Sequence, residues 1–356
     1  MPANYSVMDL PSDFRLSVAI PLFNEESVLF ELHSRLSGVL DELGGGEHEI
    51  VFVDDGSTDA TREILAGLVV ADPRVKAVLL SRNFGHQAAL SAAMDHVNGD
   101  AVVLMDGDLQ DTPETIPRFI EQFLQGFDVV YAIRKKRKES LFLRTCYATA
   151  YWVIRKLSKL NLPEGTGDFA LLSRRVVDQM KKLPERHRYL RGLRYWVGYA
   201  QTGIEVERDA RHSGESKYNF SGLCRLAFDG IFSFSVKPLR AATGIGALAV
   251  VGSLTFAAYA IFSHLFLSAS PQGFTALITV MTLLTGIQLL FLGIIGEYVG
   301  RVYEQVKFRP MYVVDEVLTV DSNVPLSETE NGKAKTFPAV SISELVPNAG
   351  STIAGS

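Results

Sequence analysis

A charge-free apolar run near the C-terminal end limits the possible folds of this chain more than any other segment. No Asp, Glu, Lys or Arg occurs from Ala241 to Gly296, and a short polar segment around Pro271 divides the run into two halves. Each half exceeds the roughly 20 apolar residues that a helix needs to cross a bilayer. Two core helices of a water-soluble domain would rarely both be this long and this free of charge. The run therefore predicts a transmembrane hairpin, with helices at about 241–267 and 273–297.

Basic residues flank only the outer ends of this run. They are Lys237 and Arg240 before it and Arg301, Lys307 and Arg309 after it, whereas the segment between the halves has none. The positive-inside rule then predicts a multi-pass protein of the inner (plasma) membrane, with both termini and the remaining chain in the cytoplasm. A homo-oligomer, tetramer or dimer, is also expected, because several glycines would allow close helix contacts: Gly244, Gly246, Gly252, Gly286, Gly293, Gly296 and Gly300.

The overall composition excludes some classes of protein. A net charge of −5 argues against a general nucleic-acid binder. Two cysteines, Cys146 and Cys224, are too few for a disulfide framework or a zinc site, which favours a reducing compartment. The N-terminus lacks the basic, apolar and small-residue succession of a signal peptide, so none is expected.

Upstream of the charge-free run, short apolar strands alternate with amphipathic helices. Five strands are predicted: Leu16–Pro21, Glu49–Val53, Val75–Leu80, Ala101–Met105 and Asp128–Ile133. The first helix has apolar residues at helical spacing from Val28 to Leu43, and Asp59 is placed to cap the second helix. This alternation predicts an α/β domain in which a mostly parallel sheet has helices on both faces.

The strand at 101–105 ends in a pair of carboxylates. Asp106 and Asp108 follow five apolar residues, and Gly107 between them permits an unusual backbone angle. Ligands of open α/β sheets bind at the carboxyl ends of the strands. Carboxylates are hard donors suited to Mg²⁺ or Mn²⁺, which also bind phosphate oxygens. A plain turn is the alternative for this pair taken alone.

Two other strand ends hold similar groups. Asn24 and Glu26 follow the first strand, and Asp54 and Asp55 follow the second. Because these ends are neighbours in a doubly wound sheet, we expect a polar ligand site along this edge. Turn chemistry and helix capping can explain any one of the three ends, but they are a poor explanation for all three together.

Several later segments connect the sheet to the hairpin. Leu141–Leu160 fits either an amphipathic helix on a membrane surface or a core helix with a basic flank. Thr166–Leu172 is predicted to be a loop that runs into an edge strand, Arg208–Lys217 a basic loop, and Asn219–Val236 a second amphipathic segment. The predicted organisation is a cytoplasmic α/β domain at 1–218, interfacial helices at 219–238, the hairpin at 239–300 and a C-terminal segment at 301–356, disordered after about 320.

Four segments resemble the inverting family 2 glycosyltransferases of the GT-A (Rossmann-like) fold. They are Pro21–Glu26 (PLFNEE), Val53–Asp59 (VDDGSTD), Ser81–Gln87 (SRNFGHQ) and Met105–Asp111 (MDGDLQD). More narrowly, they are similar to the polyprenyl-phosphate branch, related to dolichol-phosphate mannosyltransferase and bactoprenol glucosyltransferase. The resemblance implies a metal-dependent hexosyltransferase. It would move a sugar, glucose as the first guess, from a UDP-sugar to polyprenyl (undecaprenyl) phosphate.

The resemblance also implies roles for single residues. The nucleotide-sugar site would comprise Pro21, Asn24, Glu26, Asp54, Asp55, Asp106 and Gln110. The Mg²⁺ or Mn²⁺ ligands would be Asp106, Asp108 and Gln110. Arg134 would meet a phosphate, and the lipid phosphate would meet Arg208, Arg211, Ser216 and Lys217.

The chemistry agrees with this resemblance. Cleavage of a sugar–diphosphate bond builds negative charge on the leaving nucleotide, which a fixed cation stabilises. A phosphate acceptor with a second pKa of about 6 is largely ionised at neutral pH, so a strong general base is less necessary. Asp168 is the candidate for positioning the acceptor or sugar, or for acting as a base. A loop carboxylate paired with Arg174 or Arg175 is the alternative.

Three other function classes share parts of this pattern. A processive polysaccharide synthase would need more membrane spans and a Gln-x-x-Arg-Trp motif, which Arg191–Trp196 does not match. A non-catalytic nucleotide-sugar-binding membrane protein would not need metal-type carboxylates together with a basic acceptor loop. A transporter would need a polar pathway within the membrane, and two charge-free spans provide little of one.

Overall fold

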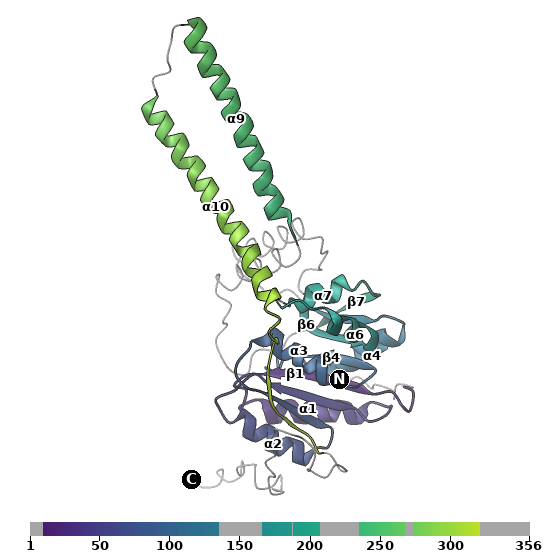
Figure 1. Cartoon of the computed structure of the whole chain (residues 1–356). Helices are drawn as coiled ribbons and strands as arrows, with labels where there is room; N and C mark the ends of the chain where they lie inside the picture. Colours follow the sequence, from purple (N-terminus) through teal and green to yellow (C-terminus); the bar gives the residue numbers. More distant parts are fainter. Residues whose placement is uncertain (1–9, 135–165, 187, 207–234, 268–272, 321–356) are drawn as a thin grey trace, which may run out of the picture.

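The computed structural model in Figure 1 shows a sheet-containing domain joined to two long helices. The structure describes residues 10–134, 166–186, 188–206, 235–267 and 273–320.

Eight strands form one sheet in the order β7-β5-β6-β4-β1-β2-β3-β8. Their bounds are β1 Leu16–Leu22, β2 Glu49–Asp54, β3 Val75–Leu80, β4 Ala101–Leu104, β5 Val129–Arg134, β6 Thr166–Ser173, β7 Gln201–Val206 and β8 Val314–Leu318. The pairs β1–β2, β1–β4, β2–β3 and β5–β7 are parallel, whereas β6 and β8 are antiparallel to their neighbours. The predicted fold class, a mostly parallel sheet with helices on both faces, is confirmed.

Helices cover both faces of the sheet because successive strand residues point to opposite sides. On one face, Leu16, Val18 and Ile20 of β1 pack with α1 (Leu29–Glu42), α2 (Thr61–Ala71) and α4 (Ile116–Leu124), the last preceded by the 3₁₀ turn η1 (Pro113–Thr115). On the other, Ala19 and Val51 pack with α3 (His86–His96), α6 (Arg174–Lys182) and α7 (Leu190–Trp196). Burial on both sides explains the continuous apolar runs of these strands.

Two strands differ from the sequence prediction. The prediction that 166–172 is a loop leading to an edge strand is wrong: β6 lies inside the sheet, between β5 and β4, and all eight of its residues are buried. Its polar start resembles a loop in sequence, but Asp168 is paired with a cation there, as described below. The second is β8, which the sequence did not reveal and which adds an antiparallel edge strand next to β3.

The apolar run forms two helices, α9 (Lys237–Leu267) and α10 (Phe274–Val306), which lie side by side in Figure 1. Their segments Lys237–Tyr259 and Val280–Val306 are long and apolar enough to cross a membrane. α10 continues past the predicted end at 297. The predictions for Leu141–Leu160, Arg208–Lys217, most of Asn219–Val236 and the tail after 320 lie outside the described residues.

The end of α10 is fastened to the α/β domain. The Gln305 side chain donates to the carbonyl of Pro184 at 2.6 Å and accepts from the backbone N–H of Arg186 at 2.9 Å. Beyond the helix, the Tyr312 hydroxyl donates to Asp95 at 2.6 Å. The chain then enters the sheet as β8.

Candidate active site

The polar residues predicted from the strand ends lie along one edge of the sheet. Strands β1, β2, β3, β4, β5 and β7 run in the same direction, so their carboxyl ends share this edge, and the antiparallel β6 begins there. β1 has β2 on one side and β4 on the other. The chain therefore reverses its direction of strand addition at β1, and ligands of open α/β sheets bind at such a switch point.

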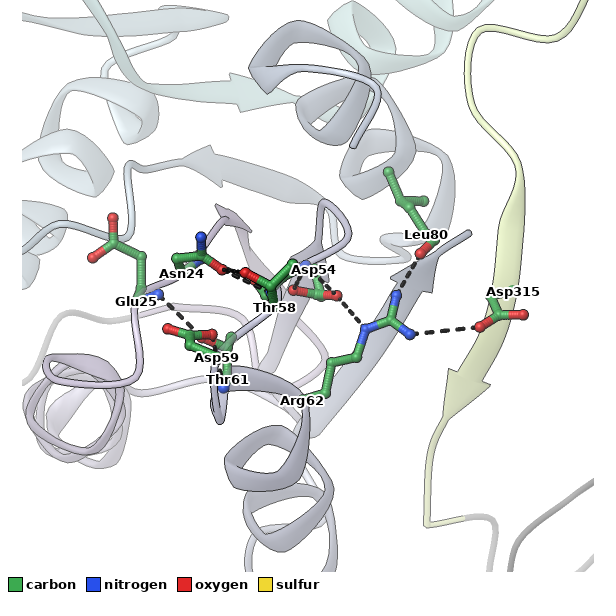
Figure 2. Close-up of polar contacts among 10 residues, drawn as sticks. Asn24, Glu25, Asp54, Thr58, Asp59, Thr61, Arg62, Leu80 and Asp315 are labelled. Carbon is green, nitrogen blue, oxygen red and sulfur yellow. Dashed lines mark hydrogen bonds and ion pairs between the residues drawn. The ribbon is translucent and has the colours of Figure 1, made fainter. Parts of the chain in front are cut away.

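The loops after β1 and β2 hold each other in place (Figure 2). The Asn24 Oδ1 atom accepts the backbone N–H of Thr58 at 2.8 Å, and the Asn24 N–H donates to the Ser57 hydroxyl at 2.9 Å. Glu26 accepts the backbone N–H of Ala60 at 2.8 Å. Asn24 has a left-handed backbone (φ 57°), which asparagine tolerates better than most residues. These hydrogen bonds join residues 24–26 to residues 57–60 in a rim at the sheet edge. The predicted residues Asn24 and Glu26 are exposed on this rim.

Asp59, predicted to cap the second helix, lies in the same pair of loops, one residue before Ala60, which is the N-cap residue of α2. The Asp59 carboxylate accepts the backbone N–H of Thr61, the first residue of α2, at 3.1 Å. Its other oxygen accepts the backbone N–H of Glu26 at 3.3 Å.

Asp54 and Asp55 are buried beneath this rim. Asp54 accepts hydrogen bonds from the Arg62 Nε atom at 2.7 Å and from the backbone N–H of Ser57. Asp55 accepts the backbone N–H groups of Phe84 at 2.7 Å and Gly85 at 2.9 Å. Burial raises the pKa of Asp55 above its usual value, and the hydrogen bonds from these two amides offset this rise only in part. Asp54 thus binds its own loop and α2, whereas Asp55 binds the loop after β3. Direct contact of either carboxylate with a nucleotide stays a prediction.

The Asp-Gly-Asp turn packs against the end of β1. A Cβ at Gly107 would lie 2.4 Å from the tip of the Leu22 side chain and 3.1 Å from the carbonyl of Pro21, so glycine allows this close approach without a shift of either neighbour. Asp106 and Asp108 on either side are partly exposed. Gln110 is buried, and its backbone N–H donates to the Asp108 Oδ1 atom at 3.1 Å.

Asp168 completes a charged cluster with Asp106. Register pairing of Leu104 with Ala170 puts the start of β6 beside the end of β4. Arg191, in the first turn of α7, donates to both Asp168 oxygens at 2.8 Å. The His86 Nε2 atom lies 3.5 Å from Asp106 Oδ1 and 3.7 Å from Asp168 Oδ2.

The cluster keeps Asp168 ionised. Burial alone would raise its pKa, but the charge and hydrogen bonds of Arg191, together with the nearby His86, hold the pKa well below its usual value. Burial lowers the pKa of His86, yet its contacts with Asp168 and Asp106 outweigh burial and raise it overall. Arg194 is buried nearby, and this burial lowers its pKa to about 10.

The structure corrects the alternative interpretation of Asp168. Arg174 donates instead to the carbonyl of Gly99 at 2.8 Å, and Arg175 pairs with Asp128. The true partner, Arg191, was seen in the sequence only as part of a motif that did not match. A buried carboxylate needs hydrogen-bond donors or a counter-charge, but nothing in the local pattern identifies which residue supplies them.

His86 was also missed, although it lies in the segment 81–87 that carries part of the family resemblance. The sequence does not show that this helix start lies beside Asp106 and Asp168. Arg134 is the last residue of β5, at the same sheet edge. Arg208, Arg211, Ser216 and Lys217 lie outside the described residues.

Paired carboxylates at the switch point of such a sheet suit an enzyme whose ligand carries phosphate groups. Comparison with known proteins identifies the family. The family model described as Glycosyl transferase family 2 matches residues 17–181. A Bacillus subtilis protein named as the uncharacterized glycosyltransferase YkcC is 42% identical over 86% of this chain and 95% of its own length. The chain belongs to glycosyltransferase family 2 and is a glycosyltransferase.

Other matches are named more narrowly. The bactoprenol glucosyl transferase of Shigella phage SfII is 40% identical over 84% of this chain and 97% of its own length. A crystal structure of glucosyl-3-phosphoglycerate synthase from Mycobacterium tuberculosis, in complex with Mn²⁺ and UDP-glucose, is 20% identical. It covers 62% of this chain and 78% of its own, with a TM-score of 0.41.

Proposed function

We propose that this glycosyltransferase moves glucose from UDP-glucose to undecaprenyl phosphate or a related polyprenyl phosphate at the cytoplasmic membrane face. An acceptor phosphate oxygen would attack C1 of glucose from the side opposite the nucleotide. The bond from C1 to the diphosphate would break, so UDP leaves and the configuration at C1 inverts. The carrying observation is that the chain leaving the apolar helix α10 joins the carboxylate-bearing edge of the sheet at the end of β3, where the backbone N–H of Ser81 donates to the carbonyl of Val313 at 3.0 Å. The bactoprenol glucosyl transferases among the relatives support the acceptor class.

The donor would lie along the carboxyl edge of β1, β2 and β4. Asn24 and Glu26 are exposed there and would contact the nucleoside, with Pro21 at the end of β1. Asp54 and Asp55 are assigned to the same site in a supporting role, because their oxygens shape the two loops that border it. A rim already tied together by hydrogen bonds loses less conformational entropy when ligand binds.

The paired carboxylates fit a divalent cation. Within the parts of the chain that the structure describes, no group of three or more His, Cys, Asp or Glu side chains is arranged to hold a metal. Two partly exposed carboxylates suit Mg²⁺ or Mn²⁺, since Mg²⁺ usually binds through one or two carboxylates plus substrate phosphates. Asp106 and Asp108 would hold the ion, with Gln110 as a further ligand. When bound, the ion would neutralise charge on the departing diphosphate.

The acceptor would reach the site from the bilayer. α9 and α10 leave most of their described apolar side chains exposed, and apolar surface on this scale indicates contact with lipid. We propose that both helices span the membrane, with the basic flanks and both termini in the cytoplasm.

A Cβ at Gly244, Gly252 or Gly293 would meet no atom within 4 Å. We propose a homo-oligomer, because glycines in such helices permit close contact between them.

Asp168 would act as a positioning residue and not as a base. A carboxylate with a depressed pKa is a weak proton acceptor, and an ionised phosphate acceptor needs little help from a base. Asp168 instead orients Arg191 and His86 at the sheet edge. Together with Arg134, these side chains would bind the anionic reactants and hold them in line.

Transfer with the purified full-length protein tests this function. The protein would be incubated with undecaprenyl phosphate and one labelled nucleotide sugar at a time: UDP-glucose, UDP-galactose, UDP-N-acetylglucosamine or GDP-mannose. We expect label in the lipid fraction with UDP-glucose and none with Asp106→Asn. Transfer from another nucleotide sugar alone would overturn the donor. Label in a polymer or a soluble product would overturn the acceptor.

Tags and a cysteine label test the orientation. In sealed right-side-out vesicles, tags at Met1 and Ser356 should be protected, whereas a label at Ser270 should be accessible. Reaction of either terminus from outside would overturn the proposed topology.

A further inference from the structure

Arg62, in the first turn of α2, joins three neighbouring strands at the site edge (Figure 2). Its Nε atom donates to Asp54 at the end of β2 at 2.7 Å. Its Nη2 atom donates to the carbonyl of Leu80 at the end of β3 at 2.5 Å. Its Nη1 atom lies 3.6 Å from the carboxylate of Asp315 in β8. A planar guanidinium can serve three acceptors at fixed angles, which a lysine cannot do.

A β-bulge directs Asp315 toward Arg62. Leu79 pairs with Glu316 and Leu80 pairs with Val314, so Asp315 has no residue opposite it in the ladder. Bulges of this kind bend a strand and redirect a side chain, often beside an active site. The irregularity thus coincides with the contact between β8 and Arg62.

The Asp54 carboxylate connects Arg62 to the rim of residues that would contact the donor. Asp54 is fully buried, and among the described residues Arg62 is its only ion-pair partner. Its two oxygens also accept the backbone N–H of Ser57, at 3.1 and 3.2 Å. Ser57 in turn accepts the backbone N–H of Asn24 through its hydroxyl. A continuous series of contacts therefore runs from β8 through Arg62 and Asp54 to the exposed Asn24.

We propose that Arg62 is a positioning residue for the donor nucleotide, and that β8 forms part of the support of the donor site. This proposal rests on the proposed function, because it concerns the same donor. α10 ends at Val306 and β8 begins at Val314, so the strand that supports Arg62 follows directly from the second apolar helix. The attachment of that helix to the domain is then linked to donor affinity.

Lysine at position 62 is the informative variant. Arg62→Lys keeps the charge that Asp54 requires but removes the fork that reaches Leu80 and Asp315. Arg74→Lys is a matched control. Arg74 donates to both oxygens of Asp72, at 3.0 and 2.9 Å, but it precedes β3 at the opposite edge of the sheet.

UDP is the probe, and its affinity is measured by calorimetry on the full-length protein in detergent, alongside the KM for UDP-glucose and kcat. For Arg62→Lys we expect UDP affinity to fall about tenfold, comparable to one charge-assisted hydrogen bond, with KM rising in parallel and kcat nearly unchanged. Arg74→Lys should bind UDP like the wild type. Equal affinity in Arg62→Lys and wild type, or an equal loss in Arg74→Lys, would overturn the proposal.

A second pair of variants tests β8. Asp315 is exposed, so Asp315→Asn should weaken UDP binding by only about two- to fivefold, whereas Glu316→Gln on the same strand should not. If Arg62→Lys does not fold, Asp315→Asn decides, and unchanged UDP affinity overturns the proposal. If the wild-type protein transfers glucose and these variants bind UDP normally, only this inference is refuted. Wild-type protein that binds no UDP would refute the proposed donor as well.

Discussion

Replacing Asp168 by Asn should separate the stability of the charged cluster from its part in transfer. The Asp168 side chain is 6% exposed and that of Arg191 is 17% exposed, so the variant leaves a largely buried guanidinium without its counter-charge. Breaking a buried ion pair from one side costs about 3–5 kcal/mol, and the partial exposure of Arg191 favours the lower end, about 3 kcal/mol. At roughly 2–4 °C per kcal/mol for a domain of this size, Tm should fall by roughly 6–12 °C.

A double variant distinguishes the two contributions. In Asp168→Asn/Arg191→Gln neither charge is buried alone, so most of the lost stability should return. Transfer should not return, because Arg191 is then missing and His86 has lost the carboxylate that orients it. For both variants we expect a loss of at least about 100-fold in kcat, the usual size for removing a fixed electrostatic group.

The assays are thermal unfolding in detergent and transfer of labelled glucose to polyprenyl phosphate, corrected for the folded fraction. Asp128→Asn is the matched control, because Asp128 is buried and paired with Arg175 but precedes β5 at the opposite edge. It should lose stability while the folded protein retains its activity. A Tm for Asp168→Asn within about 2 °C of wild type would refute the energetic argument. Restored transfer in the double variant would refute the positioning role.

Three further predictions concern the metal, the acceptor and pH. Asp106→Ala or Asp108→Ala should lower transfer at least about 100-fold, and a chelator should mimic this loss; full turnover in excess EDTA would exclude the metal. Arg211→Ala and Lys217→Ala should weaken acceptor use while donor affinity by calorimetry stays nearly normal; the opposite result would assign this basic loop to the nucleotide. Burial lowers the pKa of His48 below 6.5, so its contribution to stability is complete above that pH and is lost as the pH falls through the folded-state pKa. His48→Gln should therefore reduce the loss of Tm on mild acidification, and an unchanged pH dependence would contradict this.

Local pattern was sufficient for much of the architecture. The apolar runs from Leu16 to Leu104 became strands at nearly the predicted bounds, because a strand buried on both faces must be continuously apolar. The charge-free run likewise predicted two long helices, which the structure shows as α9 and α10. The carboxylates after β4 could be placed at the site because parallel strands end at a common edge.

Pairing across distance could not be read in the same way. The polar start of β6 resembles a loop in sequence, because the residue that neutralises Asp168 is not nearby in the chain. That residue, Arg191, lies 23 residues further along. The segment Val314–Leu318 pairs with β3, although the two long helices α9 and α10 lie between them in the sequence. Its apolar residues give no indication of this partner. Local sequence patterns indicate which residues tend to be buried or to end a strand, because these preferences act over a few residues. Which strand lies beside β3, and which cation meets Asp168 or Asp54, depends on the path of the whole chain, and only the tertiary structure decided it.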